Sequence, residues 1–74
     1  MQKKPFLDIY RAYNIGKWEI AREAKVELNV VDCMLTHEPV ARDDALKVLN
    51  VVSRLAGIRY SLKDVDVTLS ESTS

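Results

Sequence analysis

The chain has 74 residues, of which 47% are hydrophobic and 30% charged, and its eleven basic and eleven acidic side chains give zero net charge. This length predicts one domain with a modest core, and no apolar run approaches the roughly 18 residues that a membrane-spanning helix needs. The N-terminus has basic residues but lacks the apolar segment of a signal peptide, so we expect a cytoplasmic protein.

Few residues suit catalysis or metal binding. Cys33 is the only cysteine and His37 the only histidine, too few for the ligand sets of structural or catalytic zinc. One cysteine also excludes an internal disulfide. The adjacent acids Asp43 and Asp44 are explained by the dipole of a helix rather than by a catalytic pair. We therefore expect no enzyme, no metal and no cofactor, and the sequence indicates no small-molecule ligand.

Four helices are predicted in chain order by the spacing of apolar residues. The first covers about residues 5–14, with Pro5 in its first turn, and the second about residues 17–25, with Gly16 as its N-cap. A turn at residues 25–27 leads to a third helix over about residues 28–36. The fourth covers about residues 42–56 and ends at Gly57. The residues expected to face the core are Phe6, Ile9, Tyr10, Tyr13, Ile20, Ala21, Ala24, Val31, Met34, Leu35, Ala45, Val48, Leu49, Val52 and either Leu55 or Ala56.

The pattern changes after the fourth helix. Residues 61–64 predict a short helical turn capped by Ser61, and residues 65–69 alternate apolar and polar side chains with the period of a strand. Residues 70–74 are polar and are expected to fray. The sequence therefore predicts a single all-α domain, a four- to five-helix bundle over about residues 5–63 followed by a short C-terminal strand or extended arm over residues 64–69.

Charge is unevenly distributed along the chain. Residues 1–25 carry six basic and three acidic side chains, whereas residues 26–74 carry five basic and eight acidic ones. Such a dipolar chain either presents one basic face to a partner or has an ordinary solvated surface, and the sequence leaves both alternatives open.

A stretch in the middle of the chain resembles a known family. Residues 20–26 and 30–36 are similar to the helix-turn-helix of the lambda-repressor/Cro-like regulators, the xenobiotic-response-element family. In that family an alanine of the second helix packs under the third, a Gly-Val pair makes the turn, and a β-branched residue anchors the recognition helix. Ala21, Lys25-Val26 and Val31 stand at these places. Residues 39–40, 43–49 and 60–65 resemble the rest of small bacterial members, so that the likeness covers about residues 5–69.

The resemblance implies a transcriptional regulator that binds double-stranded DNA with its third helix in the major groove. Carried over position by position, it implies base contacts from Glu27, Leu28, Asn29, Asp32 and Cys33. The second helix would lie across the phosphate backbone. The implied backbone contacts are Lys17, Trp18, Lys25, Thr36, His37 and Arg42.

The chain departs from the family pattern at several of these positions. Lys25 replaces the turn glycine, so it must take a left-handed conformation or the turn must differ. Glu27 and Asp32 place acids on the recognition helix, and Cys33 stands where a basic side chain is common. These acids and the neutral net charge favour a second hypothesis, a protein-interaction module with the same fold and little or no DNA affinity.

Three of the residues have competing structural explanations. Trp18 is either a phosphate contact or an aromatic partly buried against the first or fourth helix. Asn29 either reads adenine or stands at a helix start for its local hydrogen bonding. For the single His37, an exposed or capping position is the default.

Dimerisation is expected because regulators of this class usually bind two half-sites. The candidate dimer surface is Val65, Val67 and Leu69, since one isolated strand leaves its backbone groups unpaired and a two-fold copy would satisfy them. The competing possibility is that the arm folds back onto the first and fourth helices of its own chain.

Overall fold

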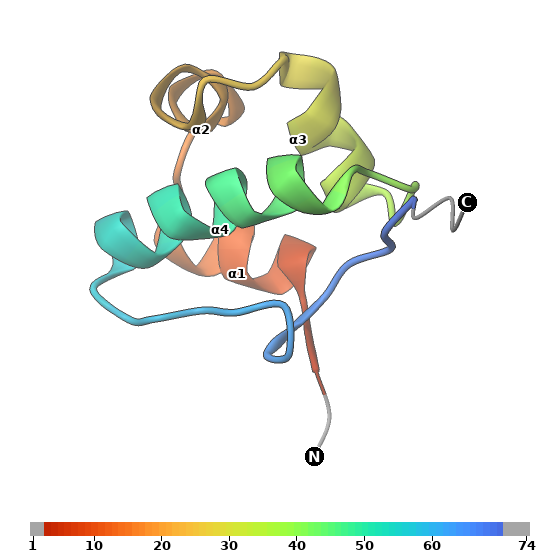
Figure 1. Cartoon of the computed structure of the whole chain (residues 1–74). Coiled ribbons are helices and arrows are strands. Elements are labelled where there is room, and N and C mark those ends of the chain that lie inside the picture. Colours follow the sequence, from red (N-terminus) through yellow and green to blue (C-terminus); the bar gives the residue numbers. More distant parts are fainter. Residues whose placement is uncertain (1–2, 71–74) are drawn as a thin grey trace.

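The computed structural model describes residues 3–70 and consists mainly of helices. The helices are α1 (Phe6–Tyr13), α2 (Lys17–Ala24), α3 (Leu28–Leu35) and α4 (Arg42–Ala56), and two short strands, β1 (Lys4–Pro5) and β2 (Val65–Asp66), lie near the ends. Helix α4 crosses the middle of the molecule, with α2 and α3 above it and α1 and the segment after α4 below (Figure 1). The small helical domain is confirmed, and a strand pair is added to the all-α fold that was expected. Apart from Ser70, the tail predicted to fray lies outside the described residues.

The core is built around α4, which buries five residues of its fifteen. Helix α2 packs against both α4 and α3, and α1 packs against α3. Ala21 and Ala24 of α2 are buried, and side chains this small let the neighbouring helices approach closely. The buried hydrophobic residues are Phe6, Ile9, Ile20, Ala21, Ala24, Val31, Met34, Val40, Ala45, Val48, Leu49, Val51, Val52 and Val65.

The apolar stripe of α4 was expected to end with either Leu55 or Ala56. Leu55 is 44% exposed and Ala56 is half-buried, so Ala56 takes that place, and Val51, which was not expected in the stripe, is buried. One expectation about the helices is wrong. Pro5 does not lie in the first turn of α1 but precedes it, with φ −60° and ψ 141°. This extended conformation suits a residue without an N–H and continues the chain backwards into β1.

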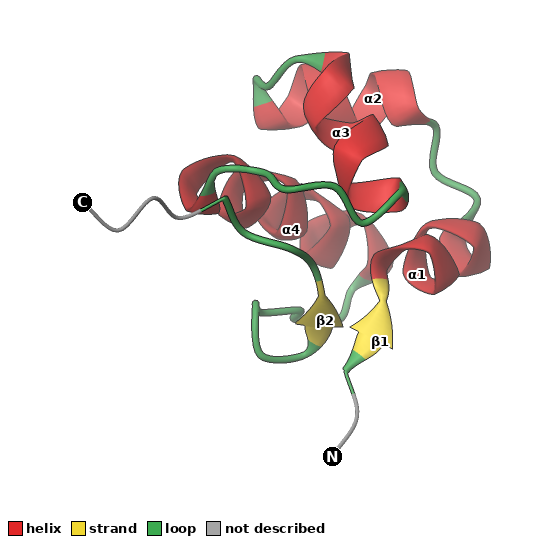
Figure 2. Cartoon of the chain, turned by 90° about the vertical axis from the view of Figure 1, so that its right-hand side faces the viewer, coloured by secondary structure: helices red, strands yellow, loops and turns green. Residues whose placement is uncertain are grey.

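Strand β1 was not predicted, and it pairs with the C-terminal arm. It lies parallel to β2, with Lys4 opposite Val65 and Pro5 opposite Asp66 (Figure 2). The N–H of Lys4 donates to the carbonyl of Asp64 at 3.0 Å. The two ends of the described chain are therefore joined by backbone hydrogen bonds.

The arm is attached a second time four residues later. Leu69 forms a bridge with Val40, which precedes α4. The N–H of Val40 donates to the carbonyl of Thr68 at 3.0 Å, and the N–H of Ser70 donates to the carbonyl of Val40 at 2.8 Å. The arm thus follows its own chain from β1 to the start of α4.

Val65, Val67 and Leu69, the predicted dimer surface, pack against their own chain instead. Val65 has no exposed surface, and Val67 and Leu69 are partly buried against the core. Strand pairing and apolar burial, the two needs that called for a second copy, are both met within the chain. The structure has the competing arrangement, in which the arm completes the core.

Replacing Val65 by alanine tests this role of the arm. Val65→Ala removes two buried carbon atoms and leaves a cavity, so we expect the free energy of unfolding to fall by about 2 kcal/mol. Asp66→Ala, at the exposed neighbouring position, should change it by less than about 0.5 kcal/mol. The measurement is denaturant unfolding at several protein concentrations. A Val65→Ala variant as stable as the parent, with a parent midpoint that rises with concentration, would contradict the intramolecular packing.

Candidate nucleic-acid interface

Helices α2 and α3 are joined by a tight turn, residues 25–27. Lys25 has φ 59° and ψ 43°, the left-handed conformation expected of a residue that replaces a turn glycine. The N–H of Val26 donates to the carbonyl of Ala21 at 3.1 Å, and the N–H of Lys25 donates to that of Arg22 at 3.3 Å. These two bonds are the Schellman ending of a helix. The turn is therefore held by backbone hydrogen bonds although no glycine is present.

Helix α3 has one face in the core and one at the surface. Val31 and Met34 are buried, while the positions on the other side are exposed or half-buried. These outward positions recur every three or four residues, as one side of a helix requires. We call them the outer stripe of α3, which consists of Asn29, Asp32, Cys33 and Thr36.

The predicted base contacts differ in accessibility. Glu27 and Asn29, at the start of α3, are exposed, and Glu27 makes no side-chain capping hydrogen bond. Leu28 and Cys33 are partly buried against the core, so only part of each is accessible. Asp32 is half-exposed, but its carboxylate has a partner within the chain.

That partner is Lys17, in the first turn of α2. Lys17 Nζ lies 2.9 Å from Asp32 Oδ1, and the two side chains are 40% and 45% exposed. The hydrogen bond to Asp32 and the charge of its carboxylate raise the pKa of Lys17 above its usual value. A predicted phosphate contact and a predicted base contact therefore bind each other. Sequence reasoning missed this pair because its members are 15 positions apart.

Thr36 and His37 form the end of α3. The Thr36 hydroxyl lies 3.0 Å from the carbonyl of Asp32 and 3.4 Å from that of Cys33, and it donates back to the helix. His37 has φ 64°, and the N–H of Glu38 donates to the carbonyl of Cys33 at 2.8 Å, a second Schellman ending. Both residues are exposed, so the exposed alternative expected for His37 is confirmed.

Of the other predicted backbone contacts, Trp18 is the most unusual. Its side chain is 75% exposed, more than any other large hydrophobic side chain in the described residues. The expectation that it packs against α1 or α4 is wrong, because residue 18 lies on the outer side of α2 while Ile20, Ala21 and Ala24 take the inner side. Lys25 and Arg42 are exposed at the end of α2 and the start of α4.

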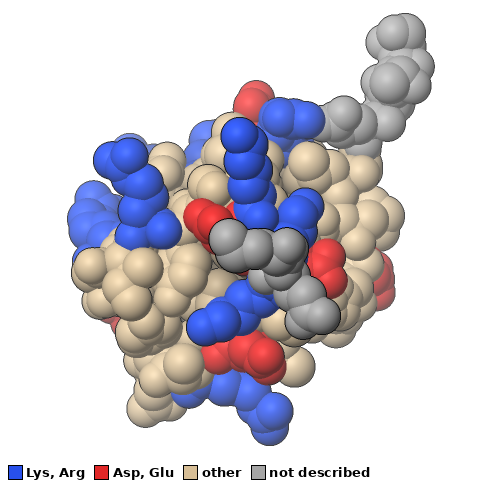
Figure 3. Space-filling view, turned by 90° about the horizontal axis from the view of Figure 1, so that it is seen from below, with Lys and Arg blue, Asp and Glu red and all other residues tan. Residues whose placement is uncertain are grey.

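The surface charge is mixed. On the face seen from below, Lys and Arg side chains are interspersed with Asp and Glu (Figure 3). Helix α3 itself has no basic residue. The described structure therefore shows no single-sign field on that face or along α3.

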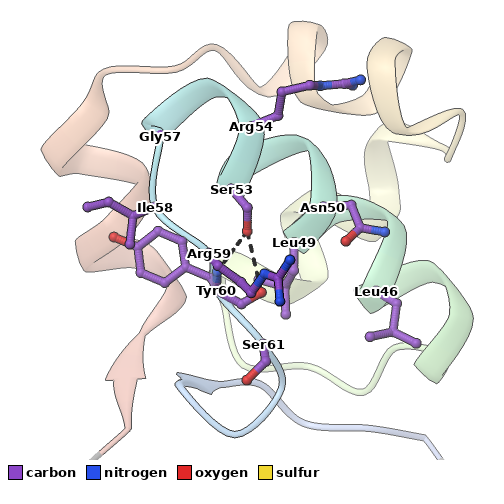
Figure 4. A pocket seen from close by; sticks show the side chains of 10 residues that line it. All are labelled: Leu46, Leu49, Asn50, Ser53, Arg54, Gly57, Ile58, Arg59, Tyr60 and Ser61. Atoms are coloured by element: carbon purple, nitrogen blue, oxygen red, sulfur yellow. Dashed lines mark hydrogen bonds between the residues drawn. The ribbon is translucent and has the colours of Figure 1, made fainter.

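A second surface feature is a shallow groove of about 520 Å³ beside the C-terminal half of α4. The Arg59 side chain lies across it, whereas Arg54 is directed toward α2, where its guanidinium lies 3.9 Å from the Glu23 carboxylate (Figure 4). None of the residues that line it, all within the described chain, is acidic. The lining residues are Leu46, Leu49, Asn50, Ser53, Arg54, Gly57, Ile58, Arg59, Tyr60 and Ser61.

Polar groups in this groove bind one another. The Ser53 hydroxyl accepts from the N–H of Tyr60 at 2.8 Å and lies 3.4 Å from the Tyr60 carbonyl (Figure 4). The Tyr60 hydroxyl lies 3.1 Å from that of Tyr13 in α1. This hydrogen bond, together with burial, raises the pKa of Tyr60 to about 12. These hydrogen bonds attach the segment after α4 to α4 and to α1. The polar groups of the groove therefore have a structural role.

Comparison of the chain with protein-family models, with curated proteins and with solved structures gives no match. Within the described residues, no three metal-ligating side chains come together. No helix among them has the length and apolar character to cross a membrane. No polar or charged residue of the described chain is fully buried. The candidates for function are therefore side chains at the surface.

The left-handed turn residue gives a stability test. In Lys25→Gly the strain of a side chain at positive φ is relieved, partly offset by the greater freedom of the unfolded chain. We expect the free energy of unfolding to rise by about 0.5–1 kcal/mol. The control Arg22→Gly, one turn earlier in α2, should lower it by about 1 kcal/mol. If both variants lose stability in thermal unfolding, the turn differs from the one described.

Tyr60 gives a pH test. Because its folded pKa lies above the ordinary value of 10, the stability it contributes is fully present below pH 10 and is lost as the pH rises through about 12. Tyr13→Phe removes the hydrogen-bond partner, so the Tyr60 pKa should fall toward 10. Spectrophotometric titration of tyrosinate measures this shift. Tyr10→Phe is the control and should leave the titration of Tyr60 near pH 12 unchanged. If Tyr13→Phe also leaves it unchanged, the pairing of the two hydroxyls is contradicted.

Proposed function

We propose that the protein is a cytoplasmic DNA-binding regulator that places α3 in the major groove of duplex DNA. The observation that carries the proposal is the α2–α3 pair, two eight-residue helices joined by a three-residue turn that leave the outer stripe of α3 uncovered, as the helix-turn-helix of such a regulator requires. In such a pair the second helix enters the groove with its N-terminal residues toward the bases, while the first crosses the phosphate backbone. The resemblance of residues 20–36 to the lambda-repressor/Cro-like regulators supports the same function.

The exposed side chains at the start of α3 suit base reading. Asn29 can form two hydrogen bonds with adenine, and Glu27 can accept from the amino group of cytosine. Around them Trp18 offers an indole N–H, and Lys25 and Arg42 offer charge to phosphates. Because α3 has no basic residue, base contacts carry more of the binding than in a strongly basic regulator, and total affinity is modest.

A protein-interaction surface is the second candidate function. Trp18 favours it, because tryptophan is enriched among the residues that dominate protein interfaces and an exposed indole gains by burial. The absence of basic residues from α3 points the same way. On this proposal the α2–α3 pair would bind a partner protein and duplex DNA would not bind.

The proposal is tested by selecting duplexes from a randomised library with the full chain. Enrichment of a defined sequence is expected, and an inverted repeat within it would indicate a homodimer formed through a surface other than the arm. Trp18 is the only tryptophan, so a change in its emission on titrating the selected duplex reports directly on α2. No enrichment at low salt would contradict DNA binding and leave the protein-interaction candidate.

Asn29 provides the matching variant. Asn29→Ala should lose about 1–3 kcal/mol of discrimination between the selected duplex and one changed at the contacted base pair. Asn50→Ala, an exposed asparagine on α4, is the control and should keep the full preference. Equal behaviour of the two variants in competition binding would show that α3 does not read the bases.

A further inference from the structure

The Lys17–Asp32 pair lies at the centre of the proposed DNA surface. Asp32 is in the middle of the outer stripe of α3, and Lys17 reaches it from the first turn of α2, the element that would cross the phosphates. At 2.9 Å the contact is a charge-assisted hydrogen bond of ordinary length. The carboxylate therefore occupies a position on Lys17 that a phosphate oxygen would take.

This arrangement acts against sequence-independent binding. Such binding comes from basic side chains that replace the counterions of phosphates. While Asp32 holds Lys17, the ammonium is neutralised locally, and a phosphate that approaches it also meets a carboxylate. One cation on this surface is thus withdrawn from DNA of arbitrary sequence.

We propose that Asp32 is a specificity-determining residue, which releases Lys17 to a phosphate only where a base-edge amino group binds its own carboxylate. A cytosine N4 or adenine N6 amino group in the major groove is a suitable donor. Random duplex offers a phosphate at every position but a suitably placed amino group at only some. Both new contacts, Lys17 to a phosphate and Asp32 to an amino group, therefore form together only on a matching sequence. This inference rests on the proposed function, because it assumes that α3 lies in the groove.

The pair is built so that it can open. Both side chains are close to half-exposed, and ion pairs of this kind are weak in water. The long flexible stem of lysine lets its ammonium move to a nearby acceptor without a change in the backbone. Exchange of partners therefore requires only side-chain motion.

The experiment compares binding to random duplex and to the selected duplex over a range of salt concentrations. In Asp32→Asn the carboxylate is lost and Lys17 is free, so affinity for random duplex at about 0.1 M salt should rise about tenfold, and the salt slope should steepen by about 0.9, the value of one phosphate contact. The ratio of selected to random affinity should fall. Thermal unfolding monitors the fold, and Asp32→Ser serves if the amide variant unfolds.

Two further variants isolate the effect. Glu38→Gln makes the same change in net charge at an exposed position beyond α3 and should alter random binding much less. Lys17→Ala alone leaves the Asp32 carboxylate without its cation and should weaken random binding, whereas the same change in the Asp32→Asn protein should remove the gain and return random binding to the level of the parent. This double-mutant cycle assigns the gain to Lys17.

The outcomes separate this inference from the proposed function. A gain in Asp32→Asn that matches Glu38→Gln, or that survives loss of Lys17, overturns the role of Asp32 even where a sequence is still selected. A selected sequence together with a Lys17-dependent gain supports both. Failure to select any sequence contradicts the proposed function, and it therefore also contradicts the proposed release of Lys17 by Asp32.

Discussion

The fold depends on the burial of the apolar side of α4. Helices α1, α2 and α3 have eight residues each, shorter than the roughly 12–15 that an isolated helix needs in water. They are therefore helical because they pack, α2 and α3 against α4 and α1 against α3. Val48 and Val52 have no exposed surface. The angle between α2 and α3, on which the proposed function rests, is thus set by what each buries rather than by the turn alone.

The arm shows that a local sequence pattern can predict a strand without predicting the segment that pairs with it. The alternation of Val65, Val67 and Leu69 predicted an extended segment correctly, but it held no information on which chain would pair with it. The pairing strand, Lys4–Pro5, has two residues and no periodicity of its own. Its parallel register with β2 follows from the packing of Val65 into the core, a contact between distant parts of the sequence.

Helix boundaries were predictable because their causes are local. Gly16 before α2 and Gly57 after α4 have the conformations expected from sequence, and the left-handed Lys25 follows from the place of a missing glycine. Side-chain placement was not predictable in the same way. Whether Trp18 is buried depends on which side of α2 meets α4, and whether Lys17 reaches Asp32 depends on the α2–α3 angle. Both are tertiary properties, and they decide the character of the candidate site.

The outer stripe of α3 and its surroundings offer directional hydrogen-bond and aromatic groups rather than a strong positive charge. A basic surface attracts any duplex over a distance comparable with the Debye length, whereas hydrogen bonds and aromatic contacts act only in the right geometry. On the proposed function, the Lys17–Asp32 pair would remove one cation from the first kind of attraction, and Asn29, Glu27 and Trp18 would supply groups for the second. A neutral chain that binds DNA in this way gives up total affinity but keeps the difference between right and wrong sequences. The same features suit a protein partner, because tryptophan is enriched among the residues that dominate protein interfaces and complementary charges contribute to the choice of partner.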